Sequence, residues 1–128
     1  MPKIFISYRR EDSAVYATRL YDHLCRYFGK DQVFLDNETI DPGVEFSKII
    51  ENALSSCDIL LVLIGKTWLT ITHEEGRRRL DEPEDLVRQE VILGLERRIP
   101  VVPLLVGGAT MPKAQDLPEA LAKLTRHN

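Results

Sequence analysis

The run Ile59-Leu60-Leu61-Val62-Leu63-Ile64 decides the fold class of this chain. No polar residue interrupts it, whereas a strand with one wet face would alternate apolar and polar residues. An uninterrupted apolar run of this kind is typical of a strand covered on both faces, and such strands occur mainly in parallel sheets. The residues on either side of it therefore have to supply further strands and the helices that connect them.

Strand-like and helical segments alternate along the rest of the chain. Short β-like runs cover residues 3–7, 33–35 and 100–105. Apolar residues spaced three and four apart predict helices over about 13–28, 44–56, 83–97 and 117–125. The order βαβαβαβα predicts an open parallel α/β sheet of the flavodoxin-like type, with about four to five strands and helices on both faces.

Local signals mark the ends of several of these elements. Asp12 or Ser13 is expected to cap the first helix, and Gly29 is expected to close it. The polar stretch Asp36–Gly43 ends in Pro-Gly and is expected to form a loop. The two prolines of segment 100–105 favour a place for that strand near the edge of the sheet, or pairing at positions that do not require their N–H groups.

Composition and charge limit the classes of partner. The chain has 128 residues, 44% of them hydrophobic, and a net charge of −3, which fits one globular domain over residues 1–128. This charge gives no electrostatic reason to expect nucleic acid or an anionic membrane as a partner. No apolar run approaches the ~20 residues of a membrane span, and no signal-peptide pattern is present. Cys25 and Cys57 are expected to be reduced thiols in a cytoplasmic protein.

Several chemistry-bearing motifs are incomplete. Gly65-Lys66-Thr67 resembles the end of a phosphate-binding P-loop, but the position of that loop's first glycine holds Leu60. No G-x-G-x-x-G is present, and the strand ends carry Ser7 and Gly65 where a phosphoacceptor receiver domain needs acids. Neither a metal site nor a His-based triad is supported by the spacing of the three histidines, His23, His73 and His127.

Three segments together resemble the Toll/interleukin-1 receptor (TIR) domain family. The first is Ile4-Phe5-Ile6-Ser7-Tyr8-Arg9-Arg10-Glu11-Asp12, similar to the family's opening F-I-S-Y motif. The second is Val33-Phe34-Leu35-Asp36 with Ile40-Asp41-Pro42-Gly43, similar to the family's second strand and BB loop. The third runs from Ser56 through the apolar strand to Trp68 and then to Val87-Arg88-Gln89-Glu90-Val91. The likeness covers nearly the whole chain. It is more similar to bacterial TIR domains than to animal receptor adaptors, particularly in Ser7–Asp12 and Asp85–Val91.

The resemblance implies one of two modes of action. In the first, the domain cleaves NAD+ at the nicotinamide–ribose bond, in bacterial immune or stress signalling. NAD+ is then the substrate and no cofactor is needed. In the second, the domain is a non-catalytic module that binds other TIR domains. In the enzymatic branch, a glutamate in the helix after the third strand is catalytic, and Glu90 occupies that position here.

The residues around Glu90 are compatible with a special environment. On a helical wheel Glu90 falls between Leu86 and Gly94, within the apolar arc of its helix. A carboxylate is costly to bury without a partner, so it is either paired inside the protein or opens onto a cleft. A salt bridge or a solvated stripe edge is the alternative to catalysis. In the enzymatic interpretation, the carboxylate stabilises the positive charge that develops on the ribose.

Further candidate ligand-binding residues come from the same resemblance. Arg9 and Arg10 match an arginine pair that contacts the nucleotide, and guanidinium groups suit a diphosphate, although a solvated basic loop is the alternative. Tyr8 is a candidate beside this pair. Asp41 matches a ligand-contacting acid or serves the turn alone.

Two aromatic residues have open roles, and one aromatic contact is missing. Phe46 and Trp68 either stack on a base or pack in the core, and the core is favoured for Phe46. Enzymatic members often have an aromatic residue four positions before the glutamate, where this chain has Leu86. Stacking from that site is therefore lost.

The resemblance also implies how the domain assembles and how it continues. TIR domains of the enzymatic branch associate when active, and the Asp36–Gly43 loop of one protomer is expected to complete its neighbour's nucleotide site. The family usually continues past a segment like Leu117–Asn128 into a fifth strand and a last helix. We therefore expect the chain to be the N-terminal part of a longer protein, whose next residues pair with the open edge of segment 100–105.

Overall fold

A parallel sheet of four strands forms the centre of the described molecule. The computed structural model describes residues 2–35 and 44–126. Its strands are β1 (Ile4–Ser7), β2 (Val33–Leu35), β3 (Ile59–Ile64) and β4 (Val101–Leu105). They lie in the order β2-β1-β3-β4, and each neighbouring pair is parallel. This arrangement confirms the open α/β sheet predicted from the apolar runs.

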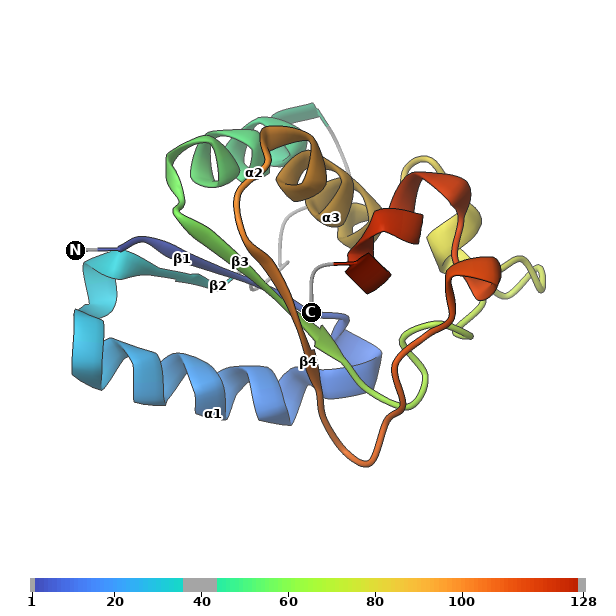
Figure 1. Ribbon diagram of the computed structural model, residues 1–128, viewed down its shortest axis with the longest axis horizontal. Coiled ribbons are helices and arrows are strands. Elements are labelled where there is room, and N and C mark those ends of the chain that lie inside the picture. The colour runs from blue at the N-terminus through green and yellow to red at the C-terminus, as the bar shows by residue number, and fades with distance from the viewer. Residues whose placement is uncertain (1, 36–43, 127–128) are drawn as a thin grey trace.

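Helices cover both faces of the sheet (Figure 1). On one face lies α1 (Arg10–Phe28), and on the other lie α2 (Val44–Ser56) and α3 (Leu86–Arg97), side by side. The short 3-10 segments are η1 (Lys30–Gln32), η2 (Arg79–Asp81), η3 (Ala114–Asp116) and η4 (Glu119–Arg126). No helix within residues 2–35 or 44–126 combines the length and the apolar character that crossing a membrane requires.

The first helix begins before its expected cap. It starts at Arg10 and departs from helical geometry at Ser13, where φ is −146° and ψ is 24°. The Asp12 carboxylate accepts hydrogen bonds of 2.8 Å from the backbone N–H groups of Gly65 and Thr67. Neither side chain caps the helix as expected: the loop after β3 uses the Asp12 carboxylate, and the Ser13 hydroxyl has no hydrogen-bond partner within the described residues.

The third helix also begins at a residue that differs from the expectation. It starts at Leu86 rather than near residue 83, because the Asp85 side chain accepts a hydrogen bond from the backbone N–H of Arg88 and caps the helix there. The end of α1 agrees with the expectation. Gly29 has a φ of 93° and donates its N–H to the Cys25 carbonyl, as a glycine at the end of a helix does.

The last segment expected to be helical, over residues 117–125, is the 3-10 segment η4 rather than an α-helix. Leu121 and Leu124 are both fully buried in the core. Their spacing matches the turn of a 3-10 helix, which brings every third side chain to the same side. The segment packs against α3.

Two apolar clusters hold the helices to the sheet. Ile4 and Ile6 of β1 belong to the cluster on the α1 side, whereas Phe5 belongs to the larger cluster beneath α2 and α3. The Phe5 ring stacks on Phe34 of β2 with 4.8 Å between the ring centroids. Since side chains alternate along a strand, Ser7 leaves β1 on the same side as Phe5, toward α3.

β4 is an outer strand of the sheet, as its prolines predict. The N–H of Val106 donates to the Ile64 carbonyl, so even-numbered residues of this segment turn their backbone groups toward β3. Pro103 therefore has its nitrogen on the outer side, where the missing N–H costs no hydrogen bond within the sheet.

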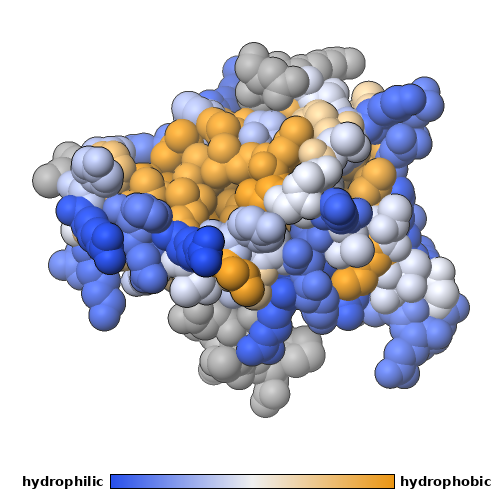
Figure 2. All heavy atoms as spheres, turned by 90° about the horizontal axis from the view of Figure 1, so that it is seen from below, coloured by the Kyte–Doolittle hydropathy of each residue, from blue (hydrophilic) through white to orange (hydrophobic). Residues whose placement is uncertain are grey.

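The face of the sheet that carries α1 has a broad apolar area beside this edge. Figure 2 looks at the molecule from that side and shows a continuous hydrophobic surface. Half-buried apolar side chains of β3 and the β4 segment lie on this face: Ile59, Leu61, Leu104 and Val106. A further strand and helix that would cover this area stay a prediction.

Candidate functional site

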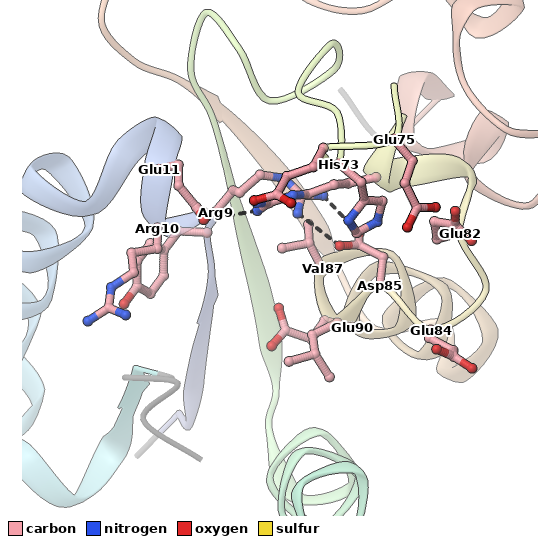
Figure 3. A pocket seen from close by; sticks show the side chains of 14 residues that line it. Arg9, Arg10, Glu11, His73, Glu75, Glu82, Glu84, Asp85, Val87 and Glu90 are labelled. Carbon is pink, nitrogen blue, oxygen red and sulfur yellow. Dashed lines mark hydrogen bonds and ion pairs between the residues drawn. The ribbon is translucent and has the colours of Figure 1, made fainter. Parts of the chain in front are cut away.

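A cavity opens at the carboxyl edge of the sheet, where parallel α/β sheets bind their ligands. Its volume of about 810 Å³ lies within the range of ~300–1,000 Å³ that is usual for small-molecule sites. Figure 3 shows side chains from the turn after β1, from residues 73–84 and from α3 converging on it. The lining residues are Tyr8, Arg9, Arg10, Glu11, His73, Glu74, Glu75, Arg79, Glu82, Glu84, Asp85, Leu86, Val87 and Glu90.

Glu90 is the buried carboxylate of this cavity. It is only 2% exposed, and the Ser7 hydroxyl donates a 2.6 Å hydrogen bond to its Oε1 atom. Val87, Val91 and Gly94 of the same helix are buried as well, so Glu90 lies within the apolar arc that the helical wheel predicts. The carboxylate therefore has a partner inside the protein and also lines a cavity.

A buried ion pair joins the turn after β1 to the start of α3. The two terminal nitrogens of Arg9 each donate a 2.8 Å hydrogen bond to one carboxylate oxygen of Asp85. The Arg9 and Asp85 side chains are 4% and 8% exposed. Since Asp85 also caps α3, this pair fixes the helix that carries Glu90 relative to the end of β1.

The lining of the cavity is predominantly acidic. It has three arginines, Arg9, Arg10 and Arg79, and seven acids, which are Glu11, Glu74, Glu75, Glu82, Glu84, Asp85 and Glu90. Ion pairs neutralise part of this charge, among them Arg79 with Glu11 at 3.0 Å and Arg77 with Glu82 at 3.3 Å. In the described chain, no ion pair forms at Glu74, Glu75 or Glu84.

The pKa of the Glu11 carboxyl is shifted by burial and by the neighbouring arginines Arg79 and Arg9. Burial raises its pKa, but hydrogen bonds from its own backbone and from Arg79, together with the charges of Arg79 and Arg9, hold the pKa below its usual range. Glu11 is thus a carboxylate near neutral pH. Within residues 2–35 and 44–126, no three His, Cys, Asp or Glu side chains are grouped so that they could hold a metal ion.

Comparison with known proteins agrees with the motifs and the sheet order. The family model of the TIR domain matches residues 4–126. The chain belongs to the TIR domain family. A similar solved structure is described as the activated Roq1 resistosome directly recognizing the pathogen effector XopQ, in its TIR domains. The likeness has a TM-score of 0.64 at 18% sequence identity, covers 98% of this chain and 70% of that chain, and supports the shared fold.

The three TIR motif residues after β1 differ from one another in burial and contacts. Tyr8 is half-buried and lines the cavity, and Arg10 is exposed at its rim. Arg9 also lines the cavity, but both of its terminal nitrogens already bind Asp85. Of the predicted arginine pair, Arg10 is therefore the residue with the exposure that a diphosphate contact requires.

Of the two aromatic candidates of the TIR domain, the structure describes the side chain of Trp68. Trp68 is fully buried in the core cluster beneath α2 and α3 and does not line the cavity, so the structure gives it the core role. Leu86, which stands where enzymatic members often have an aromatic residue, lines the cavity. Asp41 and the side chain of Phe46 lie outside the described residues.

Sequence reasoning missed Ser7 and Asp85 as members of the site. Ser7 was visible as a polar residue that ends an apolar strand, and that was its only signal. Asp85 has the sequence signal of a helix cap, but nothing in the sequence indicates that it binds Arg9, which is 76 positions away. The acids Glu74, Glu75, Glu82 and Glu84 also line the cavity, and no motif of the TIR domain pointed to them individually.

Proposed function

We propose that this TIR domain cleaves NAD+ at the nicotinamide–ribose bond, with Glu90 as the catalytic carboxylate. The observation that carries the proposal is a carboxylate, 2% exposed, in the lining of a cavity of about 810 Å³ at the carboxyl edge of the sheet. Enzymes use such buried carboxylates to stabilise positive charge that develops during a reaction. The product is ADP-ribose, in a linear or a cyclic form.

The chemistry needs little more than one negative charge. When the bond between the nicotinamide nitrogen and ribose C1′ breaks, both electrons go to the cationic nicotinamide ring, which leaves as a neutral molecule. No general acid is required for this step. Positive charge moves to the ribose, and the Glu90 carboxylate stabilises it electrostatically. Water then attacks C1′, or the adenine N1 does so in a cyclising reaction.

The distribution of charge in the cavity favours one orientation of NAD+. In the view of Figure 3, Arg10 lies on one side of Glu90, and Glu75, Glu82 and Glu84 lie on the other. The cationic nicotinamide ring fits the acidic side, whereas the diphosphate fits the side of Arg10. The ribose between these two groups then lies beside Glu90.

Assembly is the second part of the proposal. The Roq1 structure to which this chain is similar is that of an activated resistosome. We propose that this domain also acts as an assembly of TIR domains, in which the Asp36–Gly43 loop of one protomer completes its neighbour's site. Turnover per molecule then rises with protein concentration, and Gly43→Pro suppresses it. Constant turnover per molecule across a roughly hundredfold dilution would contradict this part.

The test is nicotinamide release from NAD+ by the purified protein, with chromatographic separation of linear from cyclic ADP-ribose. Glu90→Ala is compared with Glu96→Ala, because Glu96 is an exposed acid on the same helix that does not line the cavity. Release by the wild type and by Glu96→Ala, together with loss of release in Glu90→Ala, is the expected result. Undiminished release by Glu90→Ala removes Glu90 from the mechanism.

The alternative is a non-catalytic TIR module that acts by binding other TIR domains. The observation that favours it is Leu86, because an aliphatic side chain in the cavity lining provides no stacking surface for nicotinamide or adenine. Self-association without NAD+ cleavage, even at high protein concentration, would establish this role in place of the enzymatic one.

A further inference from the structure

The Ser7 hydroxyl is placed directly against the proposed catalytic group. Ser7 is the last residue of β1 and is fully buried, after the apolar residues Ile4, Phe5 and Ile6. Its Oγ atom lies 2.6 Å from Oε1 of Glu90, although the two residues are 83 positions apart in the chain. This distance is typical of a hydroxyl that donates to an ionised carboxylate, for which ~2.5–2.7 Å is usual.

The fold leaves Ser7 little choice of partner. Because side chains alternate along β1, Ser7 follows Phe5 toward the α2–α3 side of the sheet and meets α3 at Glu90. A serine hydroxyl can donate one hydrogen bond, and here Ser7 donates it to the carboxylate of Glu90. A buried polar side chain without such a partner would destabilise the fold, so the hydrogen bond has a structural value as well as an effect on the carboxylate.

We infer that Ser7 is a positioning residue for the catalytic carboxylate: its hydroxyl holds Oε1 of Glu90 and favours the ionised form, so that the negative charge stays directed at the reacting ribose. This inference rests on the proposed function, because it gives Ser7 a role in the same reaction. Ser7 does not line the cavity, so it acts on the substrate only through Glu90. Residues that orient the ligands of a metal site in this way change affinity or activity by about 10–100-fold when they are removed, and we expect an effect on the same scale here.

The chain contains a matched control serine. Ser13 is 2% exposed, does not line the cavity, and its hydroxyl has no hydrogen-bond partner within the described residues. Ser13→Ala removes the same atom as Ser7→Ala from a similarly buried place. It separates the loss of any buried hydroxyl from the loss of the contact with Glu90.

The first readout is steady-state NAD+ cleavage by the wild type, Ser7→Ala, Ser7→Thr and Ser13→Ala. We expect Ser7→Ala to lower kcat by about 10–100-fold with less than about a threefold change in KM, because the lost interaction acts on the reacting group. Ser7→Thr keeps the hydroxyl and should retain most of the activity even if its added methyl lowers the melting temperature. Ser13→Ala should have wild-type kcat.

The second readout does not depend on turnover. Carbon-13 NMR of glutamate carboxyls follows the ionisation of Glu90, whose signal is assigned by its absence in Glu90→Gln. Without the hydroxyl, the midpoint of this titration should rise by about one pH unit in Ser7→Ala and stay near the wild-type value in Ser7→Thr. Arg9, Arg10, Glu11, Asp85 and the acids of residues 74–84 line the same cavity in every variant, so the difference reports the hydroxyl alone.

The two proposals fail in different ways. A wild-type protein that never cleaves NAD+ overturns the proposed function, and with it the positioning role of Ser7. If the wild type cleaves NAD+ and Ser7→Ala cleaves it at the same rate, only the role of Ser7 is overturned. An unchanged titration midpoint in Ser7→Ala overturns the inference as well, because the hydroxyl then does not act on the carboxylate.

Discussion

Replacement of Asp85 should be among the most damaging single changes in this domain. The carboxylate accepts a hydrogen bond of 2.8 Å from each terminal nitrogen of Arg9. It also accepts one of 3.0 Å from the backbone N–H of Arg88. Asp85→Ala removes both contacts at once. It leaves the Arg9 guanidinium, with a side chain only 4% exposed, without its carboxylate.

The magnitude follows from these two losses. A buried charge that loses its partner costs about 3–5 kcal/mol, and a helix that loses its cap costs about 1 kcal/mol. The unfolding free energy of a domain of 128 residues is about 6–19 kcal/mol, so a loss of about 4–6 kcal/mol is a large fraction of it. At a typical unfolding entropy, a loss of ~4 kcal/mol lowers Tm by about 15 °C.

The assay is urea unfolding followed by the fluorescence of Trp68, the single tryptophan of the chain, which is fully buried. Asp85→Asn retains an acceptor for the helix cap but loses the charge, so it should cost about 3 kcal/mol. In the double variant Arg9→Met/Asp85→Asn no guanidinium is left unpaired. This variant should recover at least half of that loss, because apolar replacement of a buried pair is often nearly neutral.

Two results would refute this account of the pair. One is a loss of less than about 1 kcal/mol in Asp85→Asn, which would mean that Arg9 finds other partners or water. The other is a double variant no more stable than Asp85→Asn, because the cost would then not come from an unpaired Arg9.

Single contacts elsewhere in the fold give three more expectations. An added Cβ at Gly94 would lie 2.5 Å from a methyl carbon of Leu60, so Gly94→Ala should lower the unfolding free energy by ~1–2 kcal/mol despite alanine's better helix propensity, and an unchanged urea midpoint would contradict this. The hydrogen bond from Arg78 holds the pKa of Asp81 below 3.8, so the stability it contributes is present above that value and is lost as pH falls through the folded-state pKa. Asp81→Asn should therefore show a shallower loss of stability below about pH 4, whereas parallel curves for variant and wild type would exclude the effect. Burial raises the pKa of Cys57 above 9.0, so at about pH 8 a thiol reagent should label it far more slowly in the folded protein than in urea, and equal rates would show that the thiol is accessible.

The sheet was predictable from the sequence because the information for it is local. The apolar run of β3, the short strands around it and the helical spacing between them specify element types and their order without any distant contact. The prolines of β4 likewise predicted a strand at the edge, and its outer position in the sheet agrees with them. Glu90 was singled out by its match to the catalytic glutamate of the TIR family, and the apolar arc in which the helical wheel places it agrees with its burial in α3.

The details of the site were not predictable because they depend on contacts between distant residues. Asp12 and Asp85 have the same local preference for helix caps, yet only Asp85 caps its helix, whereas Asp12 binds Gly65 and Thr67 across more than 50 positions. Arg9 was expected to contact a diphosphate, and its pairing with Asp85 is visible only once the chain has folded.

The most direct test of the central claim is the rate of nicotinamide release from saturating NAD+ by Glu90→Gln, measured against the wild type at equal protein concentration. Glutamine keeps the size of the side chain and an acceptor for the Ser7 hydroxyl, and it removes the negative charge. If that charge stabilises the ribosyl cation, the rate should fall by at least about a hundredfold, with the fluorescence of buried Trp68 unchanged. A Glu90→Gln protein that is folded and releases nicotinamide at the wild-type rate would contradict the account.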